Sequence, residues 1–76
     1  MSIAEPDIVK FQKGVGKSLK KVRLSKNLSQ LDLAVLCDME KTSISRIENG
    51  RTNITLRTIY KLSYTLNIKY SELFGF

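Results

Sequence analysis

The chain has 76 residues, 42% of them hydrophobic and 26% charged, so we expect one folded domain, residues 1–76, and not a disordered segment. Its one cysteine, Cys37, excludes a disulfide within the chain and is expected in the core, and the absence of histidine excludes the usual zinc sites. The formal net charge of +6 fits an anionic partner, with nucleic acid ahead of a membrane, but fits a solvated basic surface equally well.

No apolar run approaches the length of a membrane span, and the start of the chain lacks the basic and apolar regions of a signal peptide. We therefore expect a cytoplasmic protein without a membrane partner. The charge is unevenly placed, since residues 10–26 contain seven Lys or Arg and no acid. No catalytic set or metal-ligand set converges in the sequence, so we expect no enzymatic activity, metal, cofactor or small-molecule substrate.

The first predicted helix spans about residues 7–26, after a frayed start at residues 1–6. Apolar residues recur there at spacings of 3, 4, 4 and 3, the pattern of one buried helix face: Ile8, Phe11, Val15, Leu19 and Val22. Gly14 and Gly16 should each weaken this helix by about 1 kcal/mol relative to alanine. Asn27 tolerates the left-handed conformation that closes helices, so the helix should end beside it.

Two short helices are predicted next, over about residues 30–37 and 41–48. Ser29 can cap the first of them, because its side chain can accept a hydrogen bond from a free N–H of the first turn. Asp38 and Met39 lie in the turn between the two helices, where Met39 should fill the angle between them. The second short helix should end at the Asn-Gly pair that follows it.

A fourth helix is predicted over about residues 56–66, with Thr55 as its cap, and a fifth over about residues 70–74. No segment alternates for long enough to form a strand. We therefore predict an all-α fold, a compact five-helix bundle in which the second and third helices form a helix-turn-helix.

The third helix should present a polar, basic row to solvent. Its apolar residues Ile44 and Ile47 should face the core, which turns the opposite side outward. The outward side carries Lys41, Thr42, Ser45 and Arg46. Lys and Arg can donate to guanine O6 and N7 in the major groove, and a threonine methyl can touch thymine. The row therefore favours double-stranded DNA as the partner.

The stretch SQLDLAVLCDMEKTSISRIENG, residues 29–50, resembles the helix-turn-helix of the phage repressor and Cro class, the XRE-like family. The resemblance covers roughly residues 15–74 and includes the Ser-Gln opening at 29–30, Leu-Ala at 33–34, residues 44–50 and Glu-Leu-Phe at 72–74. It implies a regulator that binds a pseudo-palindromic operator in a sequence-specific manner, as a homodimer.

The resemblance also implies two sets of DNA contacts. The base-reading set on the third helix is Lys41, Thr42, Arg46 and, as a weaker candidate, Ser45. The phosphate-contacting set is Gln30, which matches the family's phosphate clamp, with Ser29, Ser43, Asn49 and Arg51.

A structural ion pair is implied between Arg23 on the first helix and Glu48 on the third, where the family buries a salt bridge. Such pairs fix geometry more than they add net stability. Glu48 lies in the last turn of its helix, where the helix dipole disfavours an acid, so a cationic partner would explain its presence.

Surplus apolar side chains near the end of the chain predict the dimer interface, because a domain this small cannot bury them all. The predicted interface residues are Leu66, Ile68, Tyr70, Leu73 and Phe76. The tyrosines at 60, 64 and 70 are interpreted as packing or dimer contacts in preference to a platform for stacked bases.

Two residues depart from the family's pattern. Asp38 stands in the turn where glycine is usual, and because Asp tolerates positive φ, the turn should survive. Glu40 stands before the third helix where serine or threonine is usual, and glutamate caps helices poorly. Two interpretations of Glu40 stay open: its charge is repelled by phosphates but tolerated, or it accepts a hydrogen bond from a cytosine N4 amine.

The biological role is left open between a restriction-modification controller and another small regulator. The run EKTSIS, residues 40–45, resembles the recognition helix of the controllers. The chain stops two residues after the last predicted helix, so we expect regulation through concentration and dimerisation. The alternative function is a helix-turn-helix module that bridges proteins or binds RNA, although the exposed row lacks the aromatic platforms typical of RNA recognition.

Overall fold

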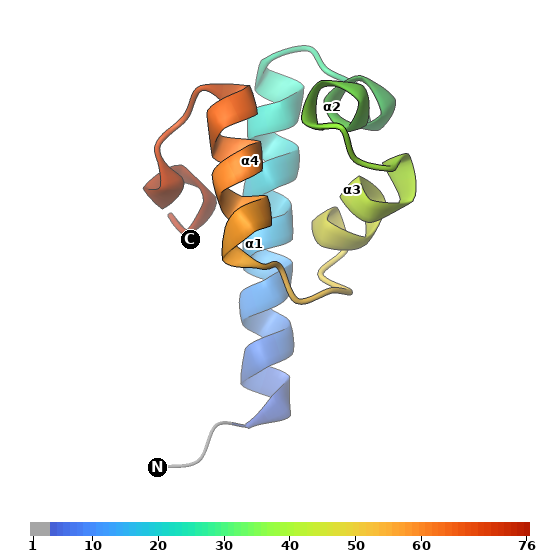
Figure 1. Ribbon diagram of the computed structural model, residues 1–76. Helices are drawn as coiled ribbons and strands as arrows, with labels where there is room; N and C mark the ends of the chain where they lie inside the picture. The colour runs from blue at the N-terminus through green and yellow to red at the C-terminus, as the bar shows by residue number, and fades with distance from the viewer. Residues whose placement is uncertain (1–3) are drawn as a thin grey trace.

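The computed structural model describes residues 4–76, which form four α-helices and one short 3₁₀-helix. The elements are α1 (Glu5–Ser25), α2 (Gln30–Cys37), α3 (Lys41–Glu48), α4 (Leu56–Leu66) and the 3₁₀-helix η1 (Tyr70–Leu73). Helix α3 packs against α1 and α2, and η1 packs against α1 and α4 (Figure 1). The described residues contain no strand, which confirms the all-α class. None of the helices within residues 4–76 has the length and apolarity needed to cross a bilayer.

The start of α1 differs from the prediction, because Glu5 and Pro6 are helical and not frayed. Pro6 costs no hydrogen bond in a first turn, and the acids Glu5 and Asp7 lie at the positive end of the helix dipole. Residues 1–3, the rest of the predicted frayed segment, lie outside the described residues. The first turns of α1 extend beyond the other helices (Figure 1).

The predicted fifth α-helix, residues 70–74, is instead a 3₁₀ turn that ends at Leu73. The backbone N–H of Glu72 donates to the carbonyl of Lys69 at 3.0 Å, and the N–H of Phe74 donates to that of Ser71 at 3.1 Å. Each of these bonds spans three residues, the spacing of a 3₁₀-helix. The described residues therefore form four α-helices and not five.

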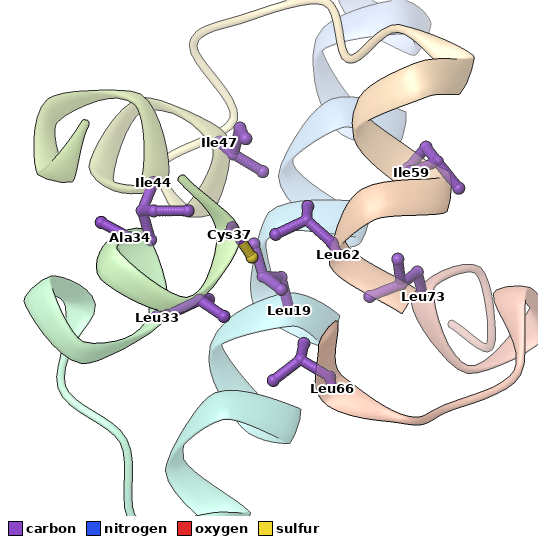
Figure 2. Close-up of a cluster of buried hydrophobic side chains, with 10 residues drawn as sticks. All are labelled: Leu19, Leu33, Ala34, Cys37, Ile44, Ile47, Ile59, Leu62, Leu66 and Leu73. Atoms are coloured by element: carbon purple, nitrogen blue, oxygen red, sulfur yellow. The ribbon is translucent and has the colours of Figure 1, made fainter. Parts of the chain in front are cut away.

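The core draws buried side chains from every element. It contains Leu19, Leu33, Ala34, Cys37, Ile44, Ile47, Ile59, Leu62, Leu66 and Leu73 (Figure 2). Cys37 is thus the core residue that the sequence indicates. Leu66 and Leu73 are 2% and 0% exposed, so their predicted place at a dimer interface is wrong. Their side chains fill the core of their own chain and are unavailable to a partner.

All four α-helices end in the same kind of turn. A residue with left-handed backbone lies just beyond each helix: Asn27, Asp38, Gly50 and Asn67, with φ between 52° and 67°. The N–H of the next residue donates to the carbonyl five residues back, at 2.9–3.2 Å. After α1, α2 and α4 that next residue is apolar and packs against the core: Leu28, Met39 and Ile68. After α3 it is the exposed Arg51.

Gly16 allows α1 and α3 to approach more closely than two side-chain-bearing helices could. A Cβ at this position would overlap the carbonyl oxygen of Ile47 and would lie 2.6 Å from that of Glu48. These oxygens belong to the backbone at the end of α3 and cannot turn aside. A Cβ at Gly14 would overlap the ring of Phe76, which is 61% exposed. Gly16 thus faces rigid backbone, whereas Gly14 faces a side chain that can move.

Replacing Gly16 with alanine should destabilise the protein, although alanine is the better helix former by about 1 kcal/mol. The overlap with the α3 backbone should outweigh that gain and lower the free energy of unfolding by about 1–3 kcal/mol. Gly14→Ala is the matched control, because the exposed Phe76 ring can move away and leave the helix-propensity gain. Urea denaturation of both variants measures the difference. Equal stability of the two variants would show that α1 and α3 do not meet at Gly16.

Candidate nucleic-acid interface

The start of α2 is held by a capping box between Ser29 and Asp32. The Asp32 backbone N–H donates to Ser29 Oγ at 2.9 Å, and the Ser29 N–H donates to Asp32 Oδ2 at 2.9 Å. The hydrogen bonds from the Ser29 backbone and then from its side chain lower the pKa of the Asp32 carboxyl below its usual value. Ser29 Oγ accepts from the Asp32 N–H, and the Ser29 hydroxyl proton is directed toward the Asp32 carboxylate.

The turn between α2 and α3 is closed by Asp38, which has φ 52° and ψ 49°. The Asp38 N–H donates to the Val35 carbonyl at 3.2 Å, and the Met39 N–H donates to the Ala34 carbonyl at 2.9 Å. Asp therefore takes the left-handed conformation that the family usually gives to glycine. Met39 is half-buried and packs against the core, so it fills the angle between the helices.

Helix α3 is anchored by its inner face. Ile44 and Ile47 are 0% and 3% exposed and point into the core (Figure 2). Lys41, Thr42 and Arg46 are exposed on the other side, and Ser45 is half-buried beside them. We call Lys41, Thr42, Ser45 and Arg46 the α3 row. All four predicted base-reading residues thus lie on one helix, and three of them are exposed.

Four of the five predicted phosphate-contacting residues lie at the two ends of the helix-turn-helix. Ser29 and Gln30 are at the start of α2, and Asn49 and Arg51 follow α3, where both are exposed. The Asn49 side-chain amide donates to Ser45 Oγ at 3.4 Å. Ser43 is half-buried in the first turns of α3.

Arg23 and Glu48 meet as a buried, two-pronged ion pair. Arg23 Nε donates to Glu48 Oε2 at 2.6 Å, and Arg23 Nη2 donates to Glu48 Oε1 at 3.0 Å. Only 7% and 2% of the two side chains are exposed. The bond to Glu48 raises the pKa of the Arg23 guanidinium above its usual value, against the opposing effect of burial. The structure therefore brings together the two residues that the family resemblance pairs.

Two further groups complete this network. Arg23 Nη1 donates to the Leu28 carbonyl at 2.7 Å, and Gln30 Nε2 donates to Glu48 Oε1 at 3.1 Å. The network therefore joins the end of α1, the start of α2 and the end of α3. The sequence does not predict the bond between Gln30 and Glu48, because only the packing of three helices brings residues this far apart together.

The remaining predicted interface residues separate into two aromatic surfaces. Tyr70 and the half-buried Ile68 line a hollow together with Tyr60 and Tyr64. The Tyr60 ring centroid lies 6.2 Å from that of Tyr64 and 6.5 Å from that of Tyr70. We call these three rings and Ile68 the tyrosine surface.

Phe76 lies instead beside Phe11 of α1, with ring centroids 5.6 Å apart, and Phe11 also stacks on Phe74 at 6.2 Å. Phe11, Phe74 and Phe76 are all at least 41% exposed. We call these three rings the phenylalanine surface. Phe76 thus does not lie in the cluster that contains Tyr70.

The sequence model of the helix-turn-helix family matches residues 19–73. The chain belongs to this family. It is 42% identical over 62 residues to the control protein C.BamHI of Bacillus amyloliquefaciens, covering 80% of this chain and 76% of that one. It is 45% identical over 61 residues to the control protein C.MunI of Mycoplasma sp, covering 79% and 82% of the two chains.

Among solved structures, the restriction-modification controller protein C.AhdI from Aeromonas hydrophila superposes with a TM-score of 0.79 at 35% identity, covering 91% of this chain and 98% of that one. The family resemblance of residues 29–50 is therefore confirmed. The protein is a helix-turn-helix transcription regulator that is similar to restriction-modification controllers.

The ion pair can be tested by a double-mutant cycle. Arg23→Met or Glu48→Leu alone leaves one buried charge without its partner and should lower the free energy of unfolding by roughly 3–5 kcal/mol. Arg23→Met and Glu48→Leu together should lose less than the sum of the two single losses. Thermal and urea unfolding measure all three variants. Arg46→Met, at an exposed arginine of α3, is the control and should change stability by less than about 0.5 kcal/mol. Strict additivity of the single losses would show that the two charges are not coupled.

Proposed function

We propose that this protein is a sequence-specific DNA-binding regulator that acts as a homodimer on a pseudo-palindromic operator and controls a restriction-modification system. The observation that carries the proposal is the α3 row, which is exposed, polar and basic on a helix whose inner face is locked into the core. Its relatives named as control proteins support the biological role. Contact with DNA explains every side chain of the α3 row, and none of them needs a catalytic role.

The chemistry of the α3 row suits the major groove. Arg46 and Lys41 can donate to guanine O6 and N7, and the Thr42 methyl can contact a thymine methyl. Ser45 is already paired with Asn49, so we assign it a secondary part in reading bases. A rigid helix favours this use, because its backbone loses little further freedom on binding.

Phosphate contacts would set the position of α3 in the groove. Gln30 is the central candidate, since its bond to Glu48 orients the amide and leaves one N–H for a phosphate oxygen. The Ser29 hydroxyl lies beside it at the start of α2. Arg51 and Asn49 lie beyond the other end of the helix-turn-helix, so α3 would be held at both ends.

The tyrosine surface is the dimer interface that we propose. Tyr60, Tyr64 and Tyr70 are 58%, 77% and 55% exposed, so three large aromatic rings lie open to solvent on one small surface. Exposed apolar patches of this kind mark interaction sites. Buried tyrosines contribute strongly to protein interfaces, because each adds a large rigid ring and a hydroxyl group. A symmetric dimer that reads two half-sites must hold its two copies of α3 about 34 Å apart, one turn of the DNA helix.

Mutation of Arg46 and of Gln30 should separate base reading from phosphate contact. Arg46→Ala should cost about 1–3 kcal/mol of binding free energy on the preferred duplex and relax the preference at one base position per half-site. Gln30→Ala should weaken binding to all duplexes about equally. Binding selections from a random duplex pool, followed by titrations at several salt concentrations, provide the measurement.

Lys21→Ala is the matched control for loss of one positive charge, since Lys21 lies on α1 beside Glu72 of η1 and not beside α3. It should leave the selected sequence unchanged. A selected sequence that is also unchanged in Arg46→Ala would show that Arg46 does not read a base.

A charged residue introduced into the proposed dimer interface should change the oligomeric state of the protein. Tyr64→Glu should place a charge in the tyrosine surface and weaken the dimer by tenfold or more, as measured by sedimentation equilibrium. Leu56→Glu is the control at the other end of the same helix, where Leu56 is 87% exposed beside the phenylalanine surface. The reverse result, a monomer for Leu56→Glu and a dimer for Tyr64→Glu, would move the interface to the phenylalanine surface.

A further inference from the structure

Glu40 precedes α3, and the fold makes no use of its carboxylate. Its backbone carbonyl accepts the N–H groups of Ser43 and Ile44 at 3.0 and 3.3 Å, so the main chain begins the helix. Its side chain makes no capping hydrogen bond. The residue is exposed, with φ −81° and ψ 147°, an ordinary extended backbone. Folding therefore gives no reason for an acid at this position.

The contacts of the carboxylate tie it to the α3 row. Thr42 Oγ1 lies 3.5 Å from Glu40 Oε2, with the hydroxyl able to donate to it, so the carboxylate lies beside the first turn of α3. Within residues 4–76 the ion pair of Arg23 and Glu48 is the only one, so neighbouring Lys41 does not neutralise Glu40.

Glu40 lies beside the α3 row and adds an anionic group that accepts hydrogen bonds without donating them, whereas the Thr42 and Ser45 hydroxyls can do both. Lys41 and Arg46 can only donate hydrogen bonds, whereas an ionised carboxylate can only accept them. In the major groove the donors are the exocyclic amino groups, cytosine N4 and adenine N6. The backbone offers anionic phosphate oxygens, which repel a carboxylate. Among the groups within reach of α3, the amino group of a base is therefore the one that complements Glu40.

We propose that Glu40 is a specificity-determining residue that accepts a hydrogen bond from an exocyclic amino group of cytosine or adenine in each half-site. The inference rests on the proposed function, since α3 must lie in the major groove. Thr42 then has two roles, because its methyl group contacts the groove and its hydroxyl lies beside the Glu40 carboxylate. Lys41 and Arg46 offset the repulsion between Glu40 and the phosphates by adding positive charge to the same surface.

The test compares three variants of the full chain on one set of duplexes. Glu40→Ala removes the acceptor and the charge, and Glu40→Gln keeps an acceptor oxygen without the charge. Asp38→Asn is the matched control: it removes an exposed acid two residues away, and asparagine tolerates the left-handed backbone found there. Random-pool selection with the unchanged protein first defines the preferred duplex. Each cytosine of a half-site is then replaced by the 2-pyrimidinone analogue without the amino group, and each adenine by unsubstituted purine.

We expect Glu40→Ala to lose affinity for the preferred duplex by on the order of tenfold and to lose the preference at one position. Glu40→Gln should keep part of that preference. One analogue should weaken the unchanged protein and leave Glu40→Ala unaffected, and the analogue that does so identifies cytosine or adenine. Asp38→Asn should bind all duplexes somewhat more tightly without a change in preference.

Tighter binding of Glu40→Ala to preferred and scrambled duplexes by the same factor, matching Asp38→Asn, would overturn the proposal and show that Glu40 acts only by repulsion. An unchanged preference in Glu40→Ala would overturn it as well. If the unchanged protein selects no sequence at all, the proposed function itself fails, and this outcome is distinct from either result with the variants.

Discussion

The ion pair between Arg23 and Glu48 lies where the end of α1, the start of α2 and the end of α3 meet. A buried charge pair of this kind contributes little net stability, because removing two ions from water offsets much of their attraction. It does restrict geometry, since each oxygen of Glu48 accepts from the guanidinium and one also accepts from Gln30. Any rotation of α3 away from α1 would leave these charges unpaired in the core.

This restriction links structure to the proposed chemistry through Gln30. The side chain that is proposed to hold a phosphate is bonded to the carboxylate that holds α3. The position of the phosphate clamp and the position of the α3 row are therefore set by the same network. Gly16 adds a second restraint of another kind, because the backbones of α1 and α3 touch there without intervening side chains.

Much of the fold is readable from the sequence, because local signals coincide with the tertiary structure. The starts of α2 and α4 follow from the capping residues Ser29 and Thr55, and the ends of α2, α3 and α4 follow from residues that tolerate positive φ, such as Asp38. The sequence-based predictions fail where only three-dimensional packing determines a residue's location or role. An apolar residue near the end of the chain predicts burial equally well in the core or in a dimer, and Leu66 and Leu73 lie in the core. The cost assigned to Gly16 in a helix is real, but a helix-propensity scale contains no information on the close approach that requires it. Membership of the α3 row was predictable, because Ile44 and Ile47 alone determine which side of that helix faces inward.

The division of labour within α3 has a consequence for how such a protein can diverge. The inner residues Ile44, Ile47 and Glu48 are buried and attach the helix to the rest of the chain, whereas Lys41, Thr42 and Arg46 are exposed. A domain of this size has little stability to lose. Substitutions in the exposed row leave that stability nearly intact, so a lineage can acquire a new operator in single steps without passing through unfolded intermediates. Under the proposed function, recognition and folding can therefore vary independently in this scaffold.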